Sequence, residues 1–400
     1  MDLAGKKIFI LGAARSGIAA ALLAKREGAF VFVSDRKKDE EIKKSVELLK
    51  ENNIAFETGR NSLERIKDFD ILILSPGVSL EEKTRIELKS QNVKILSEIE
   101  FAFRFIRVPV IAITGTNGKS TTTSLIGHIL NNAGVKAFVG GNIGNALSNL
   151  VLENRDYEVA VAEVSSFMLE DIEEFRPYIT IFTNLSPDHL DRYKNYQEYI
   201  EAKLNIFRNL DSHSYVILNL DSADLVKATE KYDVSRIFFS VHNRDAAVIA
   251  RKEGSGYRLE SRIREKFCSV HYENPNLVGL HNLENALASF CASVLYGVKQ
   301  GHIEDGINSF RGLPHRIEFV KEINGVRFYN DSKATNIDSS VVALRSFESG
   351  IVWIAGGRHK GTPYTGLAEL VKTRVRKIIA IGEAAPLITH DLSPFTDVID

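Results

Sequence analysis

The sequence has 400 residues, 44% of them hydrophobic and 26% charged, with a formal net charge of −1. This length has room for two or three globular domains, and the balanced charge offers no basic surface for nucleic acid. No apolar run approaches the roughly 20 residues that span a bilayer. With only two cysteines and no signal-peptide layout at the N-terminus, the sequence predicts a cytoplasmic protein without disulfides or a cysteine metal site.

The first hundred residues alternate strand and helix patterns. The predicted strands are 7–11, 30–34, 54–57, 70–74 and 93–96, and the predicted helices are 16–27 and 39–52. This rhythm is typical of a parallel, doubly wound α/β sheet, which binds ligands at the carboxyl edge of its strands.

A glycine turn follows the first strand. Gly12-Ala-Ala-Arg-Ser-Gly17 is similar to a dinucleotide-binding turn, and Asp35 ends the next strand. Ala14 stands where a glycine would let pyrophosphate approach closely, which argues against hydride chemistry. A nucleotide-diphosphate ligand bound in a modified way and a simple packing turn both stay open. Ser75-Pro-Gly77 is predicted at the same sheet edge.

The most informative stretch lies at 108–121. An apolar strand, 110–113, is followed by Thr114-Gly-Thr-Asn-Gly-Lys-Ser-Thr121 and a helix at 122–133. Strand, glycine turn, Lys-Ser and helix form a phosphate-binding loop, in which the glycines expose backbone N–H groups and the helix adds its positive dipole end. Lys119 can neutralise phosphates and Ser120 can bind Mg²⁺. Ile113 occupies the place of the usual first glycine, which argues against ordinary GTPases.

Further strands are predicted at 136–139, 159–162, 179–182 and 215–219, followed by a small antiparallel excursion within 236–272 and a helix at 282–296. Glu163 ends one of these strands, where an acid can hold Mg²⁺ directly or through water, although a solvated carboxylate would look the same. His189, in the polar loop after 179–182, can reach a second cation or a phosphate, or lie on the surface. Lys203 carries no signal of its own and by default is a solvated lysine.

A third unit begins near 312, with strands at 327–329, 351–355 and 377–381. Asn282 and Asn285 share one helix face and can bracket an adenine, or Asn282 can cap the helix. Arg316 can reach across a cleft to a phosphate. The polar segments 330–336 and 355–360 each follow a strand and favour an anionic ligand over plain loops.

Seven motifs in this order resemble the Mur ligase family of peptidoglycan synthesis. They are TGTNGKST, GGNIG (140–144), AEVSSF (162–167), SPDHLDRY (186–193), GLHNLENALA (279–288), GLPHR (312–316) and NDSKATN (330–336). NDSKATN, SPG and GAARSG are most similar to the member that adds D-glutamate.

The resemblance implies three domains: a Rossmann-like UDP-binding domain (1–98), a P-loop ATPase domain (99–312) and a Rossmann-like C-terminal amino-acid-binding domain (313–400). A later family motif similar to SPACASFDMF does not occur in the sequence, so the C-terminal domain is expected to be incomplete. The implied function is ATP-dependent ligation of D-glutamate to UDP-N-acetylmuramoyl-L-alanine through an acyl phosphate. ATP and two Mg²⁺ ions are the implied cofactors, acting in a monomer with small-molecule substrates and no nucleic-acid or membrane partner.

The family motifs also imply residue roles. ATP would be bound by the phosphate loop and by residues later in the chain. These residues are Gly115, Thr116, Asn117, Gly118, Lys119, Ser120, Thr121, Asn282, Asn285, Arg316 and Asp331. Glu163, His189, Ser120 and a carbamate on Lys203 would hold the metals, and Lys119, Lys203, His189 and Glu163 would be catalytic. UDP would be bound by Ser16, Asp35, Arg36 and Ser75. The substrate would also contact Asn142, and the carboxylates of D-glutamate would be bound by Thr335 and Lys360.

Three alternatives stay open. A folylpolyglutamate synthetase shares the ATPase core but has no separate βαβ domain before the phosphate loop. A sibling Mur ligase would add a different amino acid. A nucleotide-binding module without turnover belongs to another functional class.

Overall fold

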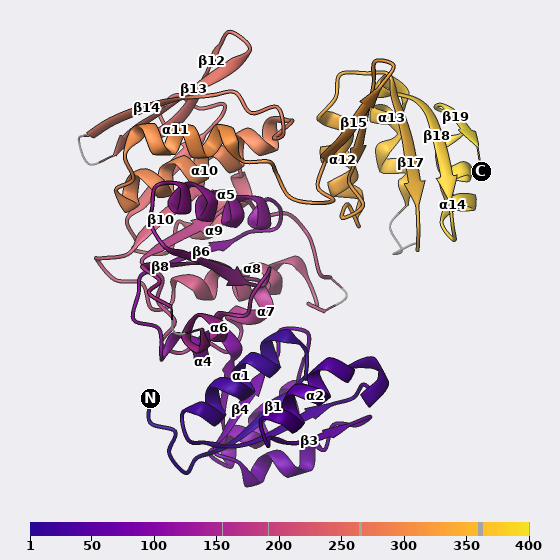
Figure 1. Ribbon diagram of the computed structural model, residues 1–400. Coiled ribbons are helices and arrows are strands. Elements are labelled where there is room, and N and C mark those ends of the chain that lie inside the picture. The colour runs from indigo at the N-terminus through magenta and orange to yellow at the C-terminus, as the bar shows by residue number, and fades with distance from the viewer. Residues whose placement is uncertain (154, 191, 264–265, 359–362, 400) are drawn as a thin grey trace.

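The computed structural model describes residues 1–153, 155–190, 192–263, 266–358 and 363–399. Its strands form four sheets along the chain, and Figure 1 shows them as an N-terminal unit, a large central unit and a C-terminal unit set to one side. In the described part of the chain, no helix has the length and apolar character needed to cross a membrane.

The N-terminal unit is a five-stranded parallel sheet with strand order β3-β2-β1-β4-β5. Its strands are β1 (Lys7–Leu11), β2 (Phe30–Asp35), β3 (Ala55–Thr58), β4 (Ile71–Leu74) and β5 (Lys94–Ser97). Its helices are α1 (Arg15–Arg26), α2 (Lys43–Glu51) and α3 (Glu82–Ser90). This sheet confirms the doubly wound prediction. The prediction of a single helix at 39–52 is wrong for its first turn. The structure has a separate 3-10 turn there, Asp39–Glu41, and α2 begins after it.

The central unit is a nine-stranded sheet with order β14-β13-β12-β11-β10-β9-β6-β8-β7. Its strands are β6 (Val110–Thr114), β7 (Ala137–Gly141), β8 (Val159–Glu163), β9 (Ile179–Phe182), β10 (Tyr215–Asn219), β11 (Arg236–Ser240), β12 (Val248–Glu253), β13 (Gly256–Ile263) and β14 (Lys266–Tyr272). The small antiparallel excursion predicted within 236–272 is confirmed for β12, β13 and β14, which pair antiparallel. It begins later than predicted, because β11 pairs parallel with both β10 and β12, and it belongs to the same sheet.

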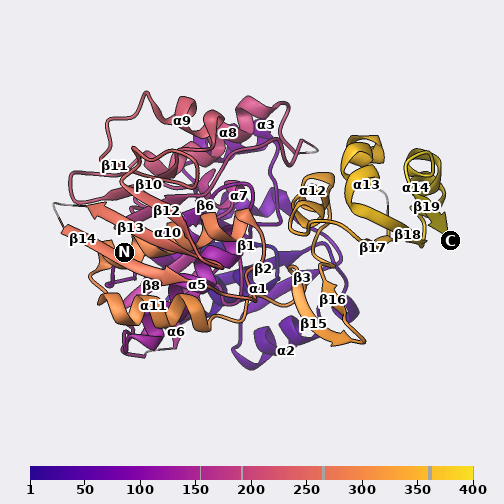
Figure 2. The same cartoon turned by 90° about the horizontal axis from the view of Figure 1, so that it is seen from above.

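Helices cover both faces of the central sheet, as Figures 1 and 2 show. They are α4 (Glu98–Phe103), α5 (Lys119–Asn132), α6 (Leu147–Leu152), α7 (Ser166–Leu169), α8 (Tyr196–Leu204), α9 (Ala223–Thr229), α10 (Leu280–Tyr296) and α11 (Gln300–Ser309). Two buried clusters lie on opposite faces. Ile111 and Ile113 of β6 pack with α5 and α10, whereas Val110 and Ala112 pack with α4, α7 and α8. β6 is apolar on both sides because it is buried on both faces.

The C-terminal unit contains two separate sheets. A hairpin joins β15 (Glu318–Ile323) to β16 (Val326–Asn330), and a parallel sheet contains β17 (Ile351–Gly356), β18 (Val375–Ile381) and β19 (Asp397–Ile399). Its helices are α12 (Ile337–Arg345), α13 (Ala368–Arg374) and α14 (Ala385–Leu392), which pack on one core with Ile378 and Ala380. The three predicted strands are present. β15 and β19 were not predicted, and the domain boundaries 98/99 and 312/313 stay predictions.

A buried carboxylate ties α4 to the segment between α7 and β9. Glu100 is fully buried, and its Oε2 accepts the backbone N–H groups of residues 173, 174 and 175 at 2.8–3.0 Å. Its Oε1 accepts from Arg104 Nε at 2.9 Å. In the same region Arg85 of α3 pairs with Asp171, whose carbonyl accepts the N–H of Ser97. These contacts fix the first sheet to the central one.

Replacing Glu100 should therefore destabilise the protein strongly. Glu100→Ala leaves three N–H groups, that of Phe175 buried, and the Arg104 guanidinium without their acceptor, at an expected cost of about 3 kcal/mol. Urea unfolding followed by circular dichroism measures it. Glu174→Ala is the matched control, because Glu174 pairs with the same Arg104 at 3.0 Å but is 62% exposed, so a loss of about 1 kcal/mol or less is expected. Equal losses in the two variants would contradict this role of Glu100.

Candidate active site

The phosphate loop, residues 115–118, connects β6 to α5 at the carboxyl edge of the central sheet. β6 lies between β8 and β9, so the loop emerges among the ends of three parallel strands. Gly118 is the N-cap of α5 and has φ +83°, and Gly115 has φ +137°. Both values lie where side chains are disfavoured, so the sequence needs glycine at both positions.

Close packing also requires glycine at positions 115 and 118. A Cβ on Gly118 would lie 2.3 Å from Asn285 Oδ1, and one on Gly115 would lie 2.0 Å from Thr183 Oγ1. Asn285 Oδ1 also accepts a hydrogen bond from Thr122 Oγ1 at 3.2 Å, which fixes α10 against α5. The loop is therefore clamped from both sides, in the shape that directs backbone N–H groups toward an anion.

The segment after β9 holds the loop from a second direction. The backbone N–H of Thr116 donates to Asn184 O at 3.0 Å, and that of Asn117 donates to Asn184 Oδ1 at 2.9 Å. Thr116 Oγ1 also lies 3.1 Å from Tyr199 OH on α8. Asn184 was not among the predicted site residues. Its only signal was its place at the end of a strand neighbouring β6.

Lys203 lies at the loop rather than in solvent. Its side chain is almost fully buried, and Nζ donates to Gly115 O at 2.8 Å. Burial, together with the positive charge of Lys119, lowers the pKa of Lys203 well below its usual value, whereas Asp188 and Glu163 oppose this shift. The default expectation of a solvated lysine is wrong. Only the family resemblance selected this residue, because nothing in a helix pattern reveals a buried lysine.

Positive charge gathers at the start of α5. Lys119 Nζ donates to Thr116 O at 2.7 Å, and the Arg316 guanidinium donates to Ser120 Oγ at 3.4 Å. Burial lowers the pKa of Lys119, while Glu163 and Asp188 oppose that shift by favouring its charged form. Added to the N-terminal end of the α5 dipole, these groups form a site for a multiply charged anion.

Glu163 lies at the end of β8 and has one oxygen without a partner. Its Oε1 accepts from Asn142 Nδ2 at 2.7 Å, while Oε2 is buried and has no hydrogen-bond partner among the described residues. A buried, unpaired carboxylate oxygen is costly unless a cation meets it. The Ser120 hydroxyl, at the start of α5, offers a further oxygen ligand. Oxygen ligands are those that Mg²⁺ prefers, so these residues fit that ion.

His189 lies in the loop between β9 and α8 with a left-handed backbone, φ +53°. Its ring contacts Phe167 edge-on at a centroid distance of 4.8 Å and lies 6.2 Å from the ring of Tyr199, which also contacts Lys203. Its Nε2 is 3.6 Å from Asp188. The aromatic contacts place His189 beside α8, on the same side of the phosphate loop as Lys203.

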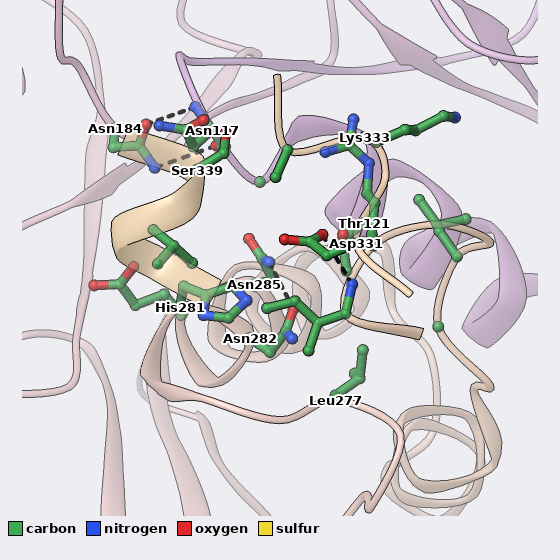
Figure 3. Close-up of a pocket in the computed structure, with 18 residues that line it drawn as sticks. Asn117, Thr121, Asn184, Leu277, His281, Asn282, Asn285, Asp331, Lys333 and Ser339 are labelled. Atoms are coloured by element: carbon green, nitrogen blue, oxygen red, sulfur yellow. Dashed lines mark hydrogen bonds between the residues drawn. The ribbon is translucent and has the colours of Figure 1, made fainter. Parts of the chain in front are cut away.

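A cavity opens between the phosphate loop, α10 and the start of the C-terminal unit. Figure 3 shows Asn282, Asn285 and Asp331 facing it. The predicted residues that line it are Asn117, Gly118, Thr121, Asn282, Asn285, Arg316 and Asp331. The residues that were not predicted as site residues are Asn184, Leu277, His281, Glu284, Gly312, Leu313, Ile317, Lys333, Ala334, Ser339 and Val342.

The residues predicted for UDP gather at the carboxyl edge of the N-terminal sheet. Asp35 Oδ2 accepts the N–H of Ala13 at 2.6 Å, and Ser75 is buried against Gly12, where a Cβ would lie 2.8 Å from Ser75 Cβ. Ser16 is buried in the first turn of α1, and Arg36 is exposed next to Asp35. The turn therefore has the tight form that Gly12 permits, with an exposed cation at its rim.

The structure does not test the two residues predicted to bind D-glutamate. Thr335 is exposed just before α12 and is not one of the described residues that line the cavity. Lys360 lies outside the described residues. Both roles stay predictions.

Known proteins resemble this chain along nearly all its length. Residues 113–293 match the Mur ligase middle domain, and residues 7–84 match the MurD N-terminal domain. The UDP-N-acetylmuramoylalanine–D-glutamate ligase of Geotalea uraniireducens (strain Rf4) is 43% identical over 398 residues, which are 99% of this chain and 87% of the relative. The ligase of the same name from Caldanaerobacter subterraneus subsp. tengcongensis is 40% identical over 97% of this chain and 85% of the relative.

The chain belongs to the Mur ligase family, with the UDP-N-acetylmuramoylalanine–D-glutamate ligases.

Solved Mur ligases share the fold. UDP-N-acetylmuramate-alanine ligase MurC from Thermotoga maritima has a TM-score of 0.61 at 20% identity, covering 98% of this chain and 90% of that one. MurF ligase from Thermotoga maritima, in complex with ADP, has a TM-score of 0.61 at 15% identity, covering 99% and 86%. At these identities the likeness concerns the fold alone, and it confirms the predicted α/β architecture of a Mur ligase.

Gly118→Ala should abolish phosphate binding at the loop of this Mur ligase. The added methyl collides with Asn285 and displaces the loop, so the dissociation constant for ATP should rise about 100-fold or more, measured by isothermal titration calorimetry. Gly134→Ala is the matched control: its φ of +84° gives the same backbone strain, but nothing lies within 4 Å of its Cβ. Similar binding losses in both variants would show that strain, and not the collision with α10, is responsible.

Proposed function

We propose that this chain joins D-glutamate to UDP-N-acetylmuramoyl-L-alanine in peptidoglycan precursor synthesis, with ATP converted to ADP and phosphate. The observation that carries the proposal is the phosphate loop clamped by Asn285 and surrounded by Lys119, Lys203 and Arg316, in a chain 43% identical to a ligase of that name. The substrates are small molecules, and we propose that the chain acts on them as a cytoplasmic monomer.

The reaction needs an activated carboxylate. The L-alanine carboxylate attacks the γ-phosphorus of ATP, ADP leaves, and an acyl phosphate forms. The amine of D-glutamate then attacks the acyl carbon, phosphate leaves with the C–O electrons, and the new amide loses its extra proton. Phosphoryl transfer depends mainly on positioning and on charge stabilisation.

The residues of the phosphate loop supply both the positioning and the charge stabilisation. The N–H groups of the first turn of α5, which begins after Gly118, orient the phosphates, and Lys119 neutralises their charge. Arg316, which comes from the segment after α11, adds a second cation from the opposite side of the cavity. Because these groups are already held in place by Thr116, Asn184 and Asn285, little reorganisation is needed when charge moves.

Glu163, Ser120, His189 and Lys203 are proposed to hold Mg²⁺, which would neutralise phosphate charge when bound. We propose two such ions, with Asn142 orienting Glu163. Asn282, Asn285 and Asp331 are proposed to bind the nucleoside part of ATP. Ser16, Asp35, Arg36 and Ser75 are proposed to bind UDP, and Thr335 and Lys360 the carboxylates of D-glutamate.

Phosphate release separates this function from its alternatives. With ATP, Mg²⁺ and UDP-N-acetylmuramoyl-L-alanine, release should rise at least tenfold when D-glutamate is added, and a product heavier by one glutamyl residue should appear in mass spectrometry. Stimulation by another amino acid alone would indicate a sibling ligase. Release that ignores every amino acid would contradict the ligase proposal.

We propose a carbamate on Lys203, a role that the family resemblance implies and that its lowered pKa and its place at the loop support. A neutral amine adds CO₂ and loses a proton, which turns a buried cation into a carboxylate suited to a metal. Protein equilibrated with ¹³C-bicarbonate should show one carbamate carbon signal in NMR, and Lys203→Arg should lack it, because guanidinium does not add CO₂. Lys299→Arg, at an exposed lysine, is the control and should keep the signal. A wild-type spectrum without the signal would remove this role.

A further inference from the structure

The nucleotide cavity extends well past the phosphate loop. Asn117, Gly118 and Thr121 line one end, and Glu284 lines another part of the wall. Glu284 interacts with Asn219, which ends β10, and β10 is separated from β6 by β9 alone. Two strand spacings of about 4.8 Å place the two strand ends about 10 Å apart. A nucleotide whose phosphates lie at β6 therefore reaches Glu284 with its base.

Glu284 is held in place from behind. Asn219 Oδ1 accepts the N–H of Asp221 at 2.9 Å, so the Asn219 amide is left to donate toward Glu284. Asp221 is itself engaged by Ser240 Oγ at 2.6 Å and by the N–H of Val241 at 2.8 Å. The carboxyl of Glu284 is thus fixed on one side and faces the cavity with its remaining hydrogen-bonding capacity.

No cation balances this carboxyl among the described residues: Asn219 and Asp221 are the groups that act on it. Burial, with a smaller contribution from Asp221, raises the pKa of Glu284 to about 7. Near neutral pH the group is therefore present both as a carboxylate, which only accepts hydrogen bonds, and as an acid, which also donates one. The neighbouring His281 stays uncharged, because burial lowers its pKa to about 4.

The two purine types differ in what their N7 edge offers such a group. On this edge adenine presents its 6-amino donor beside the N7 acceptor, whereas a 6-oxo purine presents two acceptors, O6 and N7, and carries its N1–H donor on the other edge. Selection by Glu284 therefore concerns a base that turns its N7 edge to this side chain. A carboxyl that accepts from the amino group and donates to the ring nitrogen satisfies adenine at both atoms. The same group facing O6 and N7 can satisfy only one acceptor, and as a carboxylate it repels both.

We propose that Glu284 is a specificity-determining residue that contacts the base edge of ATP and selects a 6-amino purine over a 6-oxo purine. This inference rests on the proposed function only in taking the cavity as the ATP site. Asn282 and Asn285 do not supply this selection on their own, because Asn285 Oδ1 is engaged by Thr122 and the two side chains also bond each other at 3.1 Å.

The test compares ATP with inosine triphosphate, which differs from it in having a 6-oxo group and no 6-amino group. Glu284→Ala should lower the preference for ATP, as the ratio of kcat/KM values, about tenfold, since one good hydrogen bond to the base is lost. The change should come from a higher KM for ATP, with kcat within about twofold. Glu284→Gln should keep the preference, because its amide both accepts and donates. Glu230→Ala, at an exposed position after α9, is the control and should change neither constant.

Displacement of a fluorescent ATP analogue by each nucleotide gives the same ratio without any ligation, so it stays measurable if D-glutamate proves to be the wrong amino acid. If Glu284→Ala does not fold, Glu284→Leu keeps the apolar bulk of the side chain without its hydrogen-bonding group and should show the same loss. A preference for ATP unchanged within twofold in the variant that folds would overturn the proposal. So would an equal loss for both nucleotides, which is what a purely structural role predicts.

Discussion

The site depends on one constraint: the backbone of residues 115–118 is confined between Thr183 and Asn285, with no room for a side chain at either glycine. That confinement fixes where an anion binds. It also explains why α10, more than 160 residues later in the chain, packs directly on α5, since Asn285 must reach both Gly118 and Thr122. A loop clamped in this way presents its N–H groups without further ordering, which lowers the cost of binding.

Charge is arranged around this loop so that the site is under strain until an anion arrives. Burial lowers the pKa of Lys119 and of Lys203, and the Arg316 guanidinium donates to Ser120 Oγ beside Lys119. Against these cations stands Glu163, with one oxygen engaged by Asn142 and the other unpaired. Polyphosphate with a metal ion offsets both imbalances at once, and a neutral ligand offsets neither.

Much of the fold was predictable from the sequence. β9 and β10 are short apolar runs bounded by polar residues, and such runs become buried parallel strands. Glu163 and the phosphate loop were predictable as site residues for a related reason, since strand ends of a parallel sheet meet at one edge. The parallel pairing of β11 with β12 was not predictable from the sequence, because their register depends on neighbouring strands rather than on either segment's own pattern.

Residues on helices were harder to predict than residues at strand ends. Lys203 and Glu284 lie on α8 and α10 among other polar and apolar residues, and their role comes from what the tertiary fold buries beside them. A charged residue on a helix is exposed by default, so only its three-dimensional surroundings reveal a shifted pKa. Strand β15 escaped prediction because its apolar residues do not alternate cleanly, and its pairing with β16 has a register shift between Phe319 and Lys321.

A crystal structure with a non-hydrolysable ATP analogue and Mg²⁺ tests the central claim most directly. The account predicts phosphate oxygens within hydrogen-bonding distance of the backbone N–H groups of Gly118, Lys119 and Ser120 and of Lys119 Nζ, with a metal ion on the side where Glu163 Oε2 is unpaired. Triphosphate density elsewhere, or a bound nucleotide that leaves Glu163 Oε2 without a cation, would contradict it.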